Sequence, residues 1–389
     1  MKTRNPTRRA LLALALTALN AAAARAAAEL KFADLADTVK LTGDMRLRHE
    51  QFWKKPTAKQ VDRQRERFRL RLGLEFALPN DLTAGTRLAS GTGEQVSTNQ
   101  TDGKLSSQKA LFIDQAFVKW TPKISDDGSV YAVGGRMENP FWRTYSSDLV
   151  WDADLNPEGY AEGFEVLTPL GISVFGNALQ MQADEKSGTV HDQWMIGEQG
   201  GVEMRLPLAT RLKVAGAYYH WVNADRKGSG DMGATVNQDG NRRVFPSSGT
   251  LLSGFGVQEV TGELSGWVGR LPLSVQGTFI KNLKADQKPK EDMGFQAGAI
   301  LGKAKDKGTW EAAFFRKYSQ TDSTVADVAD SDFGDGGTNR KGTLYWLAYS
   351  PTAATQLKAK YFITRTLSNA LSPGEKDIKR LQVDFQVKF

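Results

Sequence analysis

The chain has 389 residues, of which 40% are hydrophobic and 24% are charged, and it contains no cysteine. Without cysteine it can form no disulfide, thiolate nucleophile or cysteine-based metal site. Its formal net charge of +7 gives no argument for nucleic acid binding, because the excess is concentrated in the first residues.

The first 28 residues have the pattern of a secretory signal peptide. Basic residues come first, an apolar run over 10–24 follows, and Ala26-Ala27-Ala28 precedes Glu29. We predict cleavage after Ala28, with Ala24 as the alternative, because the run is too short for a membrane anchor. Five of the 51 basic residues lie in this segment, so 46 remain against 44 acidic residues, a formal charge of +2.

No later segment contains the ~20 consecutive apolar residues that a membrane-spanning helix needs. A hydrophilic exported chain is ordinarily periplasmic or secreted, but a β-barrel crosses a membrane with strands whose apolar residues alternate with polar ones. We assign residues 29–38 to a short periplasmic lead-in and residues 39–389 to an outer-membrane β-barrel.

From residue 39 onward, short and long breaks take turns between alternating segments. Most short breaks contain proline, which favours turns, and the long breaks are rich in Gly, Ser, Asp and Asn. The short breaks span 78–81, 121–128, 168–171, 206–209, 270–272, 303–308 and 350–353. The long breaks span 54–62, 91–108, 139–159, 183–191, 223–250, 283–291, 321–341 and 367–375. They predict an all-β, antiparallel up-and-down barrel of about sixteen strands, with short periplasmic turns and long extracellular loops.

The first two predicted strands indicate which residues face the lumen. Along 39–50, apolar residues such as Leu41 and Leu47 alternate with charged ones such as Arg46 and Arg48. The second strand carries an arginine ladder of one parity, opposite a continuous Phe and Leu face: Arg63, Arg65, Arg67, Arg69 and Arg71. A charge on the lipid face costs about 2–4 kcal/mol at mid-membrane, so the ladder must face the lumen.

We predict that this ladder belongs to a basic pore wall. Stacked like charges would need partners in a dry interior, whereas a water-filled lumen tolerates them. The alternative is an ordinary polar lumen whose arginines pair with acids. The predicted members, called the basic wall below, are Arg46, Arg48, Arg65, Arg67, Arg69, Arg71, Arg87 and Arg136.

The long break over 139–159 is unusually apolar for an extracellular loop, since it contains Phe141, Trp142, Leu149 and Trp151. We expect this loop to fold into the barrel and to narrow it. Its acids would then face the basic wall and set a field across the constriction. These predicted constriction acids are Asp148, Asp152, Asp154 and Glu158. The alternative is that they pair with wall arginines or stay in solvent.

The last strand alternates strictly, with Leu381, Val383 and Phe385 on one face, and it ends on Phe389. A chain that stops on such a strand resembles bacterial outer-membrane barrel proteins, in which the closing strand is also the assembly signal. Aromatic residues near the breaks fit the girdles of such barrels; they include Phe52, Trp53, Tyr219, Trp221, Trp346 and Phe362.

Several segments resemble the putative porin family of Gram-negative outer membranes. They are Gly43-Asp44-Met45-Arg46-Leu47-Arg48, residues 65–74, residues 113–120, residues 135–141 and Trp151-Asp152-Ala153-Asp154-Leu155. These motifs lie in the first half, and the second half matches by pattern only. The resemblance implies a sixteen-stranded channel, but it names no solute and supplies no established binding residues.

Other signals in the sequence are weak. The acids Asp327, Asp330, Asp332 and Asp335 lack the spacing and final Glu of a calcium loop, so we expect a solvated loop. The histidines His49, His191 and His220 have no partner at zinc spacing. We therefore predict no catalytic residue, no metal and no cofactor.

The sequence thus predicts a porin in the bacterial outer membrane that lets small hydrophilic solutes diffuse and prefers anions. A channel specific for phosphate or acidic sugars is the nearest alternative. An enzyme using His220, or an adhesin using the loops 223–250 and 321–341, is a more distant one. The expected partners are outer-membrane lipid and lipopolysaccharide, with a homotrimer as one assembly and no nucleic acid.

Overall fold

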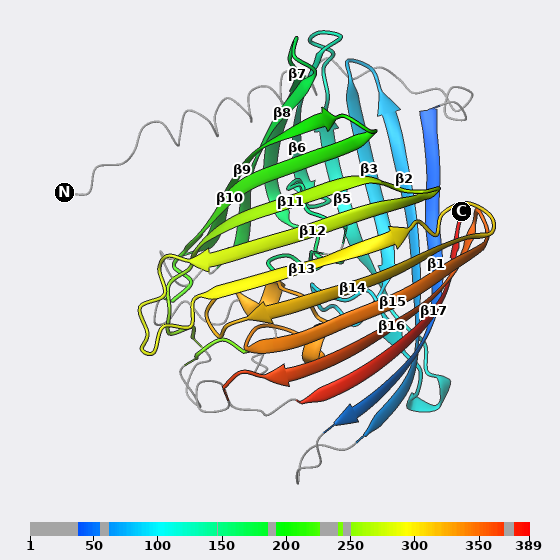
Figure 1. The fold of residues 1–389 in the computed structure, drawn as a ribbon, viewed down its shortest axis with the longest axis vertical. Helices are drawn as coiled ribbons and strands as arrows, with labels where there is room; N and C mark the ends of the chain where they lie inside the picture. Colours follow the sequence, from blue (N-terminus) through cyan, green and yellow to red (C-terminus); the bar gives the residue numbers. More distant parts are fainter. Residues whose placement is uncertain are drawn as a thin grey trace.

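The computed structural model describes residues 38–54, 62–145, 147–185, 192–225, 240–243, 250–368 and 377–389. The predicted signal peptide and all but the last residue of the predicted lead-in lie outside these ranges. The described chain folds into one antiparallel sheet that closes on itself as a barrel of sixteen long strands (Figure 1). The predicted fold class and strand number are confirmed.

The strand boundaries agree closely with the predicted breaks. The strands are β1 (Val39–Lys54), β2 (Arg63–Leu78), β3 (Leu82–Ser90), β5 (Leu111–Trp120), β6 (Gly128–Arg136), β7 (Glu158–Leu167), β8 (Ile172–Asp184), β9 (Gln193–Leu206), β10 (Thr210–Val222), β11 (Gly256–Val268), β12 (Leu271–Asn282), β13 (Met293–Gly302), β14 (Thr309–Ser319), β15 (Arg340–Thr352), β16 (Thr355–Thr366) and β17 (Ile378–Lys388). A two-residue strand β4 (Gln100–Thr101) pairs with β2 inside a loop. Three short 3₁₀ turns also lie in loops: η1 (Lys104–Ser106), η2 (Ala326–Val328) and η3 (Phe333–Asp335).

The barrel closes between its first and last strands. β1 pairs with β17 in antiparallel register from Asp44 opposite Lys388 to Lys54 opposite Ile378, and the two strands lie side by side in Figure 1. Closure leaves no open sheet edge, which a membrane-spanning sheet requires. Among the described residues, no helix is long and apolar enough to span a membrane.

Alternation along each strand separates an apolar outer face from a polar inner face. On β1, Leu41 and Leu47 are 62% and 49% exposed, whereas Arg48 and Glu50 are 4% and 0% exposed. This confirms the predicted two faces, because the exposed apolar side is the one that lipid covers. The structure corrects the aromatic assignment, however. Phe52, Tyr219, Trp221, Trp346 and Phe362 are buried inside the barrel and belong to no girdle.

Two breaks are shorter than predicted because proline lies within a strand. Pro272 is the second residue of β12 and pairs with Trp267, and Pro351 lies near the end of β15. Both occupy strand ends, where the missing N–H disturbs little of the ladder. The turns between β11 and β12 and between β15 and β16 are therefore only two residues long.

Two long loops fold into the barrel and occupy its interior. The first inserted loop is residues 137–157, between β6 and β7, and the second inserted loop is residues 320–339, between β14 and β15. The largest hydrophobic cluster joins both loops to inward residues of the strands, through Trp151 and Leu155 from the first and Val325 and Val328 from the second. The lumen is therefore partly filled by packed chain.

Candidate functional site

Aromatic side chains hold the first inserted loop against the wall formed by β9 and β10. The Trp151 ring lies 5.2 Å from Tyr219 and 6.1 Å from Trp221, and the Phe141 ring lies 5.1 Å from Tyr219. Gly197 of β9 makes this approach possible, since a Cβ added there would lie 2.6 Å from the Phe141 ring. These contacts hold the first inserted loop against β9 and β10. The opposite side of the loop faces β1 and β2.

The second inserted loop is attached to the first by main-chain hydrogen bonds. The Asp152 N–H donates to the Val328 carbonyl at 2.8 Å, and the Asp330 N–H donates to the Asp148 carbonyl at 3.1 Å. The Asp152 carboxylate also accepts the Ser331 N–H at 2.8 Å. The two loops thus form one layer across the lumen.

Six members of the basic wall come together on β1 and β2, and each has a carboxylate within 4.0 Å. Asp44 accepts from Arg69 and Arg71, each at 2.7 Å. Asp384 accepts from Arg48 at 2.7 Å and lies 4.0 Å from Arg46. Charge pairing, the alternative considered above, is therefore extensive.

Glu50 is the centre of this network and is fully buried. It accepts hydrogen bonds from Arg65 and from Arg380, the latter at 2.6 Å, and lies 3.9 Å from Arg67. Arg380 also donates to Asp332 of the second inserted loop at 2.9 Å. This network connects the strand closure at β1 and β17 to the loop layer.

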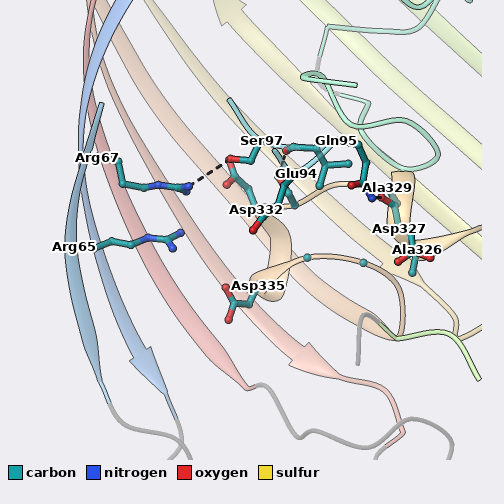
Figure 2. A pocket seen from close by; sticks show the side chains of 14 residues that line it. Arg65, Arg67, Glu94, Gln95, Ser97, Ala326, Asp327, Ala329, Asp332 and Asp335 are labelled. Atoms are coloured by element: carbon teal, nitrogen blue, oxygen red, sulfur yellow. Dashed lines mark hydrogen bonds between the residues drawn. The ribbon is translucent and has the colours of Figure 1, made fainter. Parts of the chain in front are cut away.

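Positive charge is in excess in this network. Seven arginines, the six above and Arg380, face five carboxylates, Asp44, Glu50, Asp154, Asp332 and Asp384. Arg65 and Arg67 point from β2 toward Asp332 and Asp335 across a cavity of about 220 Å³ (Figure 2). The arginines outnumber the carboxylates of this network by two. The cavity itself also contains the acid Glu94 and two paired acids, Asp327 with Arg243 and Asp335 with Lys54.

A second cavity of about 870 Å³ lies toward the short turns. Its lining includes Tyr145 of the first inserted loop together with Arg211, Glu263, Glu311 and Gln356. Lys358 lies within 5.1 Å of the Tyr145 ring centre and 4.6 Å of the Trp346 ring centre. Open space therefore exists on both sides of the charged layer.

The four predicted constriction acids occupy different places. Asp154 lies 3.6 Å from Arg69 and 3.8 Å from Arg71, facing the basic wall. Asp152 faces the second inserted loop, and Asp148 lies 3.7 Å from Arg143 of its own loop. Glu158 begins β7 and pairs with Arg136 at 2.6 Å. Only Asp154 therefore approaches the arginine ladder.

Arg87 and Arg136 form a separate group on the neighbouring strands. Arg87 pairs with Asp114 at 2.5 Å, and Arg136 donates to the Asp114 carbonyl at 2.9 Å. Asn156 of the first inserted loop donates to the Asp114 carboxylate at 2.8 Å. These two arginines anchor the end of the loop beside the main network.

The environment shifts the pKa values of the loop acids in opposite directions. Burial tends to raise the pKa of Asp154, but Arg69 and Arg46 outweigh it and hold that pKa below its usual range. In the same way Arg380 and Arg48 overcome burial and hold the pKa of Asp332 well below its usual range. Both carboxylates therefore stay charged at neutral pH.

The other two loop acids have raised pKa values. Burial and the neighbouring Asp330 raise the pKa of Asp148 to about 6, despite the opposing charges of Arg143 and Lys317. Burial and Asp154 raise the pKa of Asp152 well above its usual range. Asp148 of the inserted loop therefore gains a proton as the pH falls through about 6.

We expect Asp148→Asn to weaken the pH dependence of channel gating between about pH 4 and pH 6. A pKa raised from 3.8 to about 6 means that the docked loop holds its proton more tightly, so docking weakens as pH rises through this window. In the unmodified protein, gating transitions in a lipid bilayer should become more frequent over that range. Asp306→Asn, at an exposed turn, is the control, and an unchanged profile in Asp148→Asn would contradict this assignment.

Sequence reasoning missed the acids that pair with the wall. Asp44, Glu50 and Asp384 share the inward parity of Arg46, so alternation alone could have found them. Asp332 gave no such signal, because its loop has no periodicity. The expected solvated loop was wrong, since Asp327, Asp330 and Asp335 pair with Arg243, Lys317 and Lys54.

The histidines do not form a catalytic group in the described part of the chain. His220 contacts Lys284 at 2.9 Å, His49 contacts Glu66 at 2.6 Å, and His191 lies outside the described residues. No group of three or more acidic or histidine side chains that could hold a metal ion occurs within those residues.

Comparison with known proteins agrees with this architecture. Residues 52–252 and 254–389 match the family described as putative porin. The high-pH structure of OprB from Pseudomonas putida has a TM-score of 0.58 and 13% identity, covering 91% of this chain and 95% of OprB. Its low-pH structure has a TM-score of 0.50 and 11% identity, covering 91% and 93%. A mutant porin of Rh. blastica has a TM-score of 0.48 and 9% identity, covering 90% and 100%. A search of curated proteins found no match.

Proposed function

Because the chain belongs to the putative porin family, and so is an outer-membrane channel, we propose that it lets small hydrophilic solutes diffuse with a preference for anions. The observation that carries the preference is the surplus of two arginines in the network on β1, β2 and β17. A positive passage attracts anions and repels cations over about one Debye length, ~8 Å at physiological salt. The further acids of the cavity oppose this field, but Lys54 and Arg243 pair with two of them, Asp335 and Asp327, which leaves Glu94 as the main opposing charge.

Arg65 and Arg67 are the residues that we propose an anion meets in this layer. Both point into the 220 Å³ cavity, where Ser97 and Ser331 supply hydroxyl groups. A guanidinium offers several N–H donors in a fixed plane and can replace part of the hydration shell of an oxyanion. Arg65 already donates a hydrogen bond to Glu50, so part of its guanidinium is occupied. We therefore expect an anion to bind weakly enough to pass through the channel.

We expect the double variant Arg65→Ser/Arg67→Ser to lower the anion over cation permeability ratio roughly two- to fourfold. Each charge contributes about 0.4 kcal/mol to an ion ~10 Å away in water, and salt reduces this further. The measurement is the reversal potential of single channels in a planar bilayer under a salt gradient. Arg270→Ser/Lys307→Ser, at exposed turns, removes the same charge elsewhere. Cation preference in the unmodified channel, or an unchanged ratio in the double variant, would refute the proposal.

A channel specific for phosphate or acidic sugars is a second candidate. The paired guanidinium groups of Arg65 and Arg67 at one cavity favour it, because they match phosphate and carboxylate geometry (Figure 2). Millimolar phosphate or galacturonate should then reduce chloride conductance in a saturable way. A conductance that is indifferent to both would leave only the general channel.

We also propose the remaining features expected from the sequence. The mature chain begins at Glu29, which the mass of the purified protein tests. The channel has no enzymatic activity, so incubation with lipid and peptide substrates should yield no products. It lies among lipid and lipopolysaccharide as a homotrimer, and its mass in mild detergent tests that assembly.

A further inference from the structure

Four basic side chains lie on the lipid-facing side of neighbouring strands, all near the long loops. They form what we call the outer basic patch: Arg316 on β14, Lys341 on β15, Arg365 on β16 and Lys379 on β17. All four are exposed and have the parity opposite to buried neighbours such as Lys317, Arg340 and Arg380. The patch therefore lies on the outer wall, separate from the lumenal arginines.

The strand register brings these side chains together. Lys341 is directly opposite Arg365, with Tyr318 on the other side of Lys341. Two residues along the strands, a second row begins with Arg316 on β14 and ends with Lys379 on β17. Thr343 and Ile363 separate these two cations, whose backbones are three strand spacings, about 14 Å, apart. Facing side chains of this kind have Cβ atoms about 4.5–5.5 Å apart, and the two rows are separated by ~7 Å.

Within the described residues, no acidic side chain pairs with the patch. None of its four cations makes an ion pair with any described residue. The outward positions of β14–β17 include no Asp or Glu at all. The nearest acid in sequence, Asp377, precedes β17 and accepts the Thr366 N–H at 3.2 Å. Like charges placed directly opposite destabilise a sheet, so an anion bound between Lys341 and Arg365 would relieve their repulsion.

The position of the patch indicates which anion that is. Toward the short turns the same faces are apolar and aromatic, with Phe314, Tyr345 and Leu347 all exposed. A lipid-facing Arg or Lys costs about 2–4 kcal/mol at mid-membrane but about 0–1 near the interface. The patch lies at the interface of the long-loop end, which in such barrels is the outer leaflet. Phosphate groups of lipid lie at that depth.

We propose that the outer basic patch binds the phosphate groups of a bisphosphorylated glycolipid of the outer leaflet, such as lipopolysaccharide. One phosphate fits between the adjacent Lys341 and Arg365, and the other fits beside Arg316 or Lys379 of the second row. An Arg side chain offers bidentate contacts to a phosphate. The Phe295–Tyr318 pair, at 5.6 Å, and the Trp53–Tyr361 pair, at 6.4 Å, flank the patch and provide surface for sugar rings and acyl chains. The proposal rests on the membrane location and is independent of the anion preference of the lumen.

The test is binding of bisphosphoryl lipid A to the folded full-length mature protein in detergent, followed by native mass spectrometry. Lys341→Gln/Arg365→Gln should weaken binding about 30-fold, since each charge near a phosphate contributes roughly 1 kcal/mol. Arg270→Gln/Lys307→Gln, at exposed turns of the other end, should bind as the unmodified protein does. Conductance in a bilayer shows that each variant is folded, and it should not change.

Three results would overturn the proposal. Lipid A without phosphates could bind equally well, or phosphatidylglycerol could bind as tightly as bisphosphoryl lipid A. Binding could also be unchanged in Lys341→Gln/Arg365→Gln.

A second barrel is the competing occupant, because its exposed outward acid Glu198 could face the patch. Loss of oligomer mass in this variant without any lipid would identify that contact and refute the glycolipid site. None of these outcomes bears on the reversal potential, so failure here is distinguishable from failure of the proposed selectivity.

Discussion

Replacing Glu50 with alanine should lower the free energy of unfolding by about 3–5 kcal/mol, because breaking a buried ion-pair network leaves charges without compensation. Glu50 is 0% exposed and accepts from Arg65, from Arg380 at 2.6 Å and from Gln382 at 3.0 Å. Without it, the four arginines that lie within 4.0 Å of its carboxylate, Arg48, Arg65, Arg67 and Arg380, would repel one another. The closure between β1 and β17 should loosen first, since Arg380 and Gln382 lie on β17.

The measurement is urea unfolding of the protein in lipid vesicles, with Glu75→Ala as the matched control. Glu75 lies on β2 and pairs with Lys40 at 3.6 Å, but both side chains are exposed to solvent. Such a pair contributes only about 0–1 kcal/mol. Equal destabilisation by the two substitutions would show that Glu50 is not the centre of the network. Glu50→Gln should also raise the anion preference, because it removes a negative charge from the passage.

Alternation made the barrel wall predictable from sequence. A period of two assigns every strand residue to lipid or lumen, so Leu41 outside and Arg48 inside followed directly. The same rule applied to single residues would have separated Phe52, which is 0% exposed, from its neighbour Trp53, which is 41% exposed. The prediction grouped aromatic residues by their distance from the breaks and did not apply that rule. It therefore assigned Phe52 wrongly to the girdle.

The contents of the barrel could not be predicted in the same way. Pairing between Arg380 and Asp332, or between Lys317 and Asp330, depends on where an aperiodic loop folds back. The apolar residues Phe141 and Trp151 indicated that one loop would insert, since water would not favour them outside. The second inserted loop is rich in Asp, Ser, Thr and Gly, and its burial results from hydrogen bonds that composition does not reveal. Asn241, for example, donates to the carbonyl groups of Thr321 and Thr324 at 2.7 and 2.9 Å.

We expect Trp151→Ala to release the first inserted loop from the wall and to increase single-channel conductance. Trp151 is 3% exposed and packs on Phe141, Tyr219 and Trp221 within one hydrophobic cluster. Removing a buried Trp side chain costs about 3–5 kcal/mol. These aromatic contacts join the loop to β10, so this loss falls on docking while the hydrogen bonds between the strands remain.

Trp310→Ala is the control, because Trp310 lies near the start of β14, is 39% exposed and has the parity opposite to the buried, inward Glu311. In bilayers, Trp151→Ala should give larger openings and more frequent transitions, whereas Trp310→Ala should keep the conductance of the unmodified channel. Undocking also takes Asp154 away from Arg69 and Arg71, which leaves the basic wall less neutralised. Conductance and anion preference should therefore rise together. An increase in conductance with a fall in anion preference would mean that the loop contributes more than its acidic charge to selectivity. Unchanged conductance would mean that the first inserted loop does not narrow the passage.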